Sequence, residues 1–116
     1  MISHETENGS VNVSARVYTD IAGTAASNCF GVKGMAARSV RDGLYHLLRK
    51  ESASKGVNVE IHDDNTITIN LHIMVDSGVN LNAVGNAIIS EVRYVVTNTT
   101  GTEIRDVNVF IDSIVI

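Results

Sequence analysis

The side chains that could carry chemistry in this chain are four histidines, one cysteine and one pair of adjacent carboxylates. The histidines are His4, His46, His62 and His72. None of them lies three to five residues from another, which is the spacing typical of zinc sites. Cys29 follows a predicted helix, at the end where the helix dipole raises a thiol pKa, and turn formation explains Asp63 and Asp64. We therefore expect no enzyme, no metal site and no cofactor.

A second pattern with chemical meaning is Gly31-Val32-Lys33-Gly34, which with Met35 is predicted to form a tight, exposed turn between two helices. In K-homology RNA-binding domains, a G-x-x-G turn between two helices clamps the nucleic-acid backbone. Lys33, Arg38 and Arg41 would add positive charge here. The net charge of −4 argues against nucleic acid as a partner, because phosphate binding needs clustered Lys and Arg. RNA binding is therefore the alternative hypothesis, and an ordinary solvated helix surface also explains these basic residues.

Hydrophobic periodicity predicts the elements that must position these residues. From Thr66 to Val75 apolar and polar residues alternate, which is typical of a strand with one buried face. The predicted buried residues are Ile67, Ile69, Leu71, Ile73 and Val75. From Leu81 to Val96 the apolar residues recur every three or four positions, which predicts a long helix with an apolar stripe.

The segment before this strand predicts a β-hairpin. Val57, Val59 and Ile61 alternate with polar residues and would pair antiparallel with Leu71, Ile69 and Ile67 respectively. This register leaves Asp63-Asp64-Asn65 as a three-residue loop, in which the asparagine tolerates the left-handed conformation that such a loop requires.

The N-terminal third predicts one short strand and two helices. Residues 1–9 read as a flexible lead-in, and Val11 and Val13 as a strand. Ser14 is a good N-cap for a helix over residues 15–28, on which Val17, Ile21 and Ala25 share a face. A second helix is predicted over residues 39–50.

The C-terminal strand is predicted to be apolar on both sides. Val107, Val109, Ile111 and Val115 alternate on one side, and Phe110, Ile114 and Ile116 lie on the other. Such a strand is either covered twice or carries an exposed patch that awaits a partner. We predict self-association through Phe110, Ile114 and Ile116.

Composition limits where the protein acts. With 116 residues the chain is long enough for one domain with a modest core. No apolar run approaches the roughly 18 residues that span a bilayer, and the polar N-terminus is not a secretory signal. A single cysteine excludes an internal disulfide and favours a reducing cytoplasm.

Motifs along nearly the whole chain occur in a specific order. They are Val11-Asn12-Val13-Ser14, Gly31-Val32-x-Gly34-Met35, Lys55-Gly56-Val57-x-Val59, Ile69-x-Leu71-x-Ile73-x-Val75, Gly78-Val79-Asn80, Thr100-Gly101 and Val107-Asn108-Val109. In this order and spacing the chain resembles the alkaline-shock, or envelope-stress-response, protein family of Gram-positive bacteria. The resemblance implies a small, non-enzymatic cytoplasmic protein that self-assembles and is tied to the membrane through a membrane-anchored partner of the same pathway.

These expectations combine into a single α+β domain over residues 10–116, with elements in the order β-α-α-β-β-α-β. One small mixed sheet would hold the hairpin, the C-terminal strand and the short N-terminal strand, packed by two N-terminal helices and the long helix. A right-handed connection after Val75 makes that strand parallel to the one at Val107. The leading hypothesis is a non-catalytic scaffold or adaptor that forms homo-oligomers and binds a partner through residues 31–35 with Arg38 and Arg41.

Overall fold

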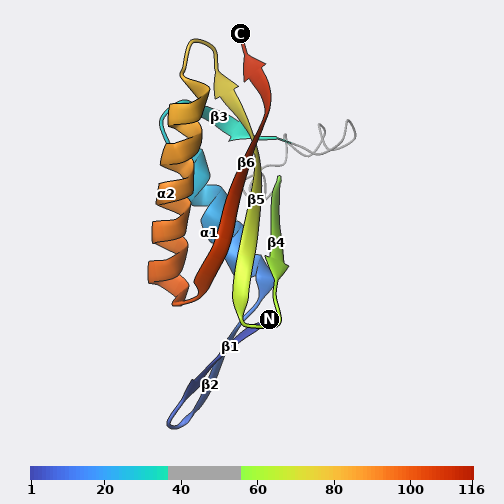
Figure 1. The fold of residues 1–116 in the computed structure, drawn as a ribbon, viewed down its shortest axis with the longest axis vertical. Helices are drawn as coiled ribbons and strands as arrows, with labels where there is room; N and C mark the ends of the chain where they lie inside the picture. The colour runs from blue at the N-terminus through green and yellow to red at the C-terminus, as the bar shows by residue number, and fades with distance from the viewer. Residues whose placement is uncertain (37–55) are drawn as a thin grey trace.

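The computed structural model describes residues 1–36 and 56–116, and these form an α+β fold with two sheets (Figure 1). The elements of the described residues are β1 (Ile2–Thr6), β2 (Gly9–Val13), α1 (Ala15–Ser27), β3 (Val32–Met35), β4 (Val57–Ile61), β5 (Thr66–Asp76), α2 (Leu81–Thr100) and β6 (Glu103–Val115). The predicted order is therefore not the observed one. The predicted helix over residues 39–50 lies outside the described residues.

Strand β5 is the centre of the main sheet. Its five alternating apolar residues, from Ile67 to Val75, are all fully buried, as their period of two predicted. One of its edges pairs with β6 over the whole length of β5. The other edge pairs first with β4 and then with β3, which lie end to end beside it. In the described residues, every strand pair of the main sheet therefore includes β5.

The predicted hairpin is confirmed in its register. Val57 pairs with Leu71, Val59 with Ile69 and Ile61 with Ile67. Asn65 takes a φ of +66° in the loop, the left-handed conformation that asparagine tolerates better than most residues. The loop is closed further by Asp64, whose carboxylate accepts hydrogen bonds from the backbone N–H and the hydroxyl of Thr66.

The junction between β3 and β4 depends on Gly56. The carbonyl oxygen of Gly56 accepts from the backbone N–H of His72, while the carbonyl oxygen of His72 accepts from Ala36. Gly56 has a φ of +77°, and a Cβ atom here would lie 2.5 Å from the carbonyl oxygen of Ala36. Only glycine fits this position, because both the backbone conformation and the space exclude a side chain.

Helices α1 and α2 cover one face of the main sheet and pack on each other (Figure 1). The predicted stripe of α2 is confirmed at Val84, Ile88, Val92 and Val96, which are buried. On α1 the predicted face is partly wrong, because Val17 is exposed while the next residue, Tyr18, is fully buried. The Tyr18 hydroxyl lies 2.6 Å from the hydroxyl of Thr102, the residue before β6, so the buried tyrosine keeps a hydrogen-bond partner.

The N-terminal residues form a separate two-stranded sheet. Residues 1–9, for which the sequence predicted a flexible lead-in, contain β1, which pairs antiparallel with β2. The prediction that the strand at Val11 and Val13 joins the main sheet is wrong, because this strand takes β1 as its partner. Ile2 is fully buried at the base of this hairpin, whereas residues 5–12 are exposed. We call β1 and β2 together the arm, and it projects from the end of the molecule opposite the C-terminus (Figure 1).

Strand β6 pairs parallel to β5, as predicted, but two bulges interrupt it. The register skips Arg105 and Asp112, so each of them is an extra residue in β6. The second bulge reverses the alternation: Phe110 pairs with His72 on the sheet face away from the helices, whereas Ile114 pairs with Val75 on the helix-covered face. The prediction that Phe110 and Ile114 share one side is therefore wrong.

Replacing Gly56 with Ala should lower the free energy of unfolding by at least about 2 kcal/mol, because it adds a backbone clash to the cost of a left-handed alanine. Gly101→Ala is the matched control, since Gly101 has a similar φ of +74° and open space around it. It should cost only about 1 kcal/mol. Urea unfolding followed by circular dichroism measures both, and equal losses would contradict the role assigned to the Ala36 and His72 carbonyl groups.

Candidate functional site

The predicted partner-binding turn at residues 31–35 is a strand from Val32 onward. Val32–Met35 forms β3 and pairs antiparallel with β5, so the prediction of a tight exposed turn is wrong. Val32 and Met35 face the same apolar core as Val75 and Ile73, and this burial favours a strand over a turn. A G-x-x-G clamp needs a loop between helices, and the described residues place the segment in a sheet instead.

The two ends of this segment are buried and its middle is exposed. A Cβ atom at Gly31 would lie 3.0 Å from a methyl group of Val84, and Met35 is only 4% exposed. Lys33 is exposed, and its ammonium group lies 3.4 Å from the carboxylate of Asp76. Gly34 pairs with Met74 and is half-buried. Arg38 and Arg41 lie outside the described residues. Of the three basic residues predicted to bind a partner, Lys33 is the one that the structure describes.

The predicted self-association residues lie on β6, which pairs with β5 alone in the described residues. Phe110 is 46% exposed and stacks on His72, with 4.8 Å between the ring centroids. Ile114 is 47% exposed and Ile116 fully exposed. Because its second side has no neighbour there, β6 presents unpaired backbone N–H and C=O groups along one edge.

The bulge at Asp112 is anchored by His72. The carboxylate of Asp112 lies 3.1 Å from Nδ1 of His72, a hydrogen bond that requires the proton on Nδ1. His72 thus contacts β6 through both a polar bond and its stacking on Phe110. Sequence reasoning could not find this pair, because His72 and Asp112 are 40 residues apart.

A groove of about 400 Å³ runs between the N-terminal half of α2 and the middle of β6. It is lined by Leu81, Asn82, Gly85, Asn86 and Ile89 on the helix and by residues 107–111 on the strand. Apart from its own stretch of helix, no described atom would lie within 4 Å of a Cβ atom at Gly85, so the helical wall of the groove is open there. We call this hollow the α2–β6 groove, and it borders the unpaired edge of β6.

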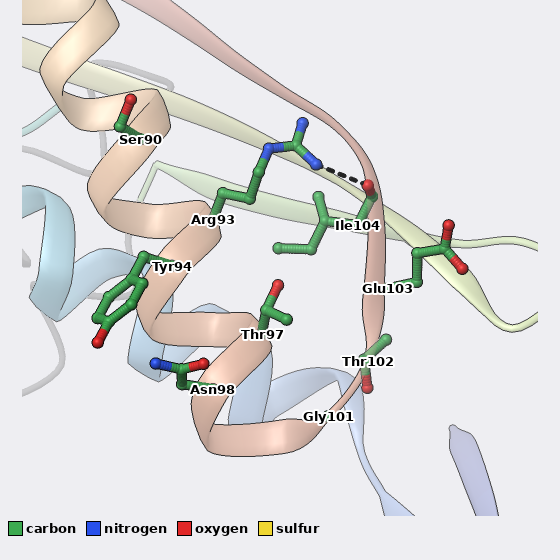
Figure 2. Close-up of a pocket in the computed structure, with 9 residues that line it drawn as sticks. All are labelled: Ser90, Arg93, Tyr94, Thr97, Asn98, Gly101, Thr102, Glu103 and Ile104. Carbon is green, nitrogen blue, oxygen red and sulfur yellow. Dashed lines mark hydrogen bonds between the residues drawn. The ribbon is translucent and has the colours of Figure 1, made fainter.

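A second hollow continues along the same two elements toward the start of β6 (Figure 2). Arg93 extends from α2 across this hollow, and its guanidinium donates a hydrogen bond of 2.8 Å to the carbonyl oxygen of Ile104. This contact occupies a backbone acceptor at the beginning of β6. The arrangement offers side-chain and backbone hydrogen bonds together with apolar surface, which suits binding of a polypeptide segment.

Apolar side chains are also exposed at the end of the molecule that carries the C-terminus. Phe30 is 88% exposed and lines a hollow with residues 76–80 and the first turn of α2. Leu81, Ile114, Val115 and Ile116 are also exposed. An exposed aromatic residue beside an apolar hollow is a common feature of protein contact sites.

His46 lies outside the described residues, and the other histidines and the cysteine have hydrogen-bond partners. His62 Nε2 lies 2.8 Å from the Thr68 hydroxyl, and His4 Nε2 lies 3.3 Å from the Thr102 hydroxyl. The Cys29 thiol donates to the carbonyl oxygen of Ala25. Burial, and after it the negative charge of Glu91, raises the pKa of this thiol, so that it is protonated at neutral pH.

Comparison with known proteins identifies relatives over almost the full chain. The model of the alkaline-shock protein 23 family, described as having a cell envelope-related function, matches residues 3–116. The uncharacterized protein YloU of Bacillus subtilis is 33% identical over 114 residues, which cover 97% of this chain and 94% of that protein. The uncharacterized protein Spy1614 of Streptococcus pyogenes serotype M6 is 32% identical, over 94% of this chain and 90% of that protein. No solved structure matches the chain.

The length and the apolar character of a helix decide whether it can cross a membrane. Neither helix of the described residues combines the length and the apolar character needed to cross a bilayer.

The rate at which iodoacetamide alkylates Cys29 should rise with pH. The midpoint of this rise should lie at a higher pH than for an ordinary thiol, because the thiolate is the reacting form and the pKa is raised. Glu91→Gln removes a negative charge that disfavours the thiolate, so it should move the curve to lower pH. Mass spectrometry of the alkylated protein against pH measures this. A curve unchanged by Glu91→Gln would mean that this carboxylate does not act on Cys29.

Proposed function

The chain belongs to the alkaline-shock protein 23 family, whose described function is related to the cell envelope, and from this premise we propose that it is a non-catalytic scaffold or adaptor. It acts in the envelope stress response through protein–protein contacts and through self-association. The resemblance seen in the sequence and the family match over residues 3–116 support the same assignment.

The observation that carries this proposal is the open edge of β6. This strand has 13 residues, and in the described part of the chain it pairs on one side alone, so its other side presents a row of hydrogen-bonding groups that a further strand can satisfy. Beside it lie the α2–β6 groove and the exposed Phe110, which add apolar contact area. These features support contact with another polypeptide, whereas RNA recognition through residues 31–34 loses its basis because Val32, Lys33 and Gly34 belong to a strand.

The proposed location follows from the family rather than from the fold. We propose that the protein is cytoplasmic and reaches the membrane through a membrane-anchored partner of the same pathway. The exposed end around Phe30 and Ile116 is the second surface available for such a partner.

Sedimentation velocity over a concentration series tests the proposal, with and without a labelled mixed-sequence RNA at low and at physiological salt. We expect the sedimentation coefficient to rise with protein concentration while the RNA sediments alone. A protein that stays monomeric throughout would refute self-association. RNA that sediments with the protein, and dissociates as salt rises, would restore the K-homology hypothesis.

Phe110→Asp should weaken self-association at least tenfold, because it places a charge at the edge that another strand must approach. The fold should be kept, since Phe110 is half-exposed and its stacking on His72 contributes only about 1 kcal/mol. Val17→Asp, at an exposed apolar position on α1, is the control and should assemble as the wild type does. If both variants assemble equally well, the C-terminal strand does not mediate the contact.

A further inference from the structure

We propose that the arm of one copy adds as a further strand to β6 of the next copy, through the free edge of β2. In this contact Val11 enters the α2–β6 groove. The inference rests on the proposed self-association and specifies which surfaces make it. It is carried by the arm, by the bulges of β6 and by the space at Gly85.

Among the residues that the structure describes, the arm is a β-ribbon of two strands. Residues 5–12 are exposed, and Val11 is 56% exposed although it is a β-branched apolar residue. An isolated two-stranded ribbon is only marginally stable in water, and a third strand or an apolar surface stabilises it. The first residues of β1 are fixed to the rest of the fold, because Ile2 is buried and His4 contacts Thr102. In the described residues β2 is exposed from Gly9 to Asn12, and Val13 at its base packs against the core, so β2 offers the free edge.

The acceptor on β6 has a defined length. Its bulges at Arg105 and Asp112 leave one regular segment of six residues, from Asp106 to Ile111. Arg93 occupies the carbonyl group of Ile104 before this segment, and His72 holds Asp112 after it. Strand β2 has five residues and matches this segment, whereas a second β6 of 13 residues would meet both bulges.

The groove beside this segment accepts the side chains of β2. In Gly9-Ser10-Val11-Asn12-Val13 the apolar residues alternate with small polar ones. Val13 packs against the core of its own chain, so Val11 is the apolar side chain of β2 that can enter a groove while the opposite face stays in water. The groove lies along residues 107–111, and its helical wall is open at Gly85. A valine is small enough to pack there against Leu81 and Ile89.

Charge disfavours the alternative in which two arms pair with each other. The arm carries Glu5 and Glu7, and it contains no lysine or arginine. Glu5 lies on β1 and Glu7 in the turn after it, so two paired arms would gather four carboxylates on one ribbon with no positive charge to offset their repulsion. The strand segment Asp106–Ile111 carries a single carboxylate, and the lining of the α2–β6 groove contains no charged side chain.

The two surfaces lie apart on the elongated molecule. The arm projects at one end, while the groove lies along the half of α2 nearer the opposite end (Figure 1). A contact between unlike surfaces is heterologous, so each copy keeps a free arm or a free groove for the next one. The assembly therefore grows head to tail into a ring or an open filament. Growth of such an assembly depends on the protein concentration.

Disulfide trapping between two single-cysteine proteins tests the contact. Val11→Cys and Gly85→Cys are each made in a Cys29→Ala background, mixed at equal concentration and oxidised. We expect a covalent dimer in the mixture and little in either protein alone, because only the mixture joins an arm to a groove. A dimer of Val11→Cys alone, at the level of the mixture, would show arm-to-arm pairing and overturn the proposal.

A pair of substitutions at Gly85 separates assembly from folding. Gly85→Gln should raise at least tenfold the concentration at which the protein assembles, because its side chain fills the groove. It should not lower the melting temperature, since glutamine is a better helix former than glycine and meets no atom of its own chain near Cβ. Gly85→Ala also favours the helix but adds only a methyl group, so it should assemble nearly as the wild type does.

The outcomes distinguish this inference from the proposed function. If the wild type assembles, Gly85→Gln assembles equally well and no mixed disulfide forms, the arm-to-groove contact is overturned while self-association stands. A wild type that never assembles would overturn both.

Discussion

The structure depends on the burial of one face of β5. Five apolar side chains, from Ile67 to Val75, are fully buried beneath the two described helices, and both edges of the strand carry hydrogen-bonded neighbours. At roughly 25 cal/mol for each Å² of apolar surface removed from water, this row is among the largest stabilising contributions available to a chain of this size. Each other strand of the main sheet takes its register from β5, and a slip by one residue would turn its apolar side chains to the opposite face.

The use of both edges of β5 explains where contact surfaces can arise. Strands β3 and β4 divide one edge between them, and the close approach of backbone at Gly56 lets both fit. Strand β6 occupies the other edge in full and becomes the outer strand on that side. Its bulges, together with Arg93 and His72, restrict the open edge to a short segment beside the groove. Proteins commonly limit exposed edges in this way, which makes pairing selective rather than general.

The same reasoning links the fold to a scaffold role. A cell envelope-related family member that acts by contact needs surfaces that bind other chains without aggregating. An arm with two carboxylates and a short acceptor edge meet both needs, because the arm repels another arm and the edge admits only a short strand. The exposed end around Phe30 borders the α2–β6 groove at Leu81 and offers further apolar area for a second partner.

Local patterns were enough to predict β5, α2, the register of the β4–β5 hairpin and the left-handed Asn65, because each depends on residues near one another in the sequence. Family membership was likewise readable from motif order. The sequence predicts a turn where β3 forms. Gly31 and Gly34 indicate a turn locally, whereas the strand pairing of β3 depends on a partner about 40 residues away. The bulge at Asp112, the exclusion of β2 from the main sheet, and the groove at Gly85 were also decided by tertiary structure. In each of these cases the deciding contact joins residues that are far apart in the chain. The sequence by itself therefore determined which faces of the strands and helices are buried. Only the tertiary structure decided which strand edges remain open.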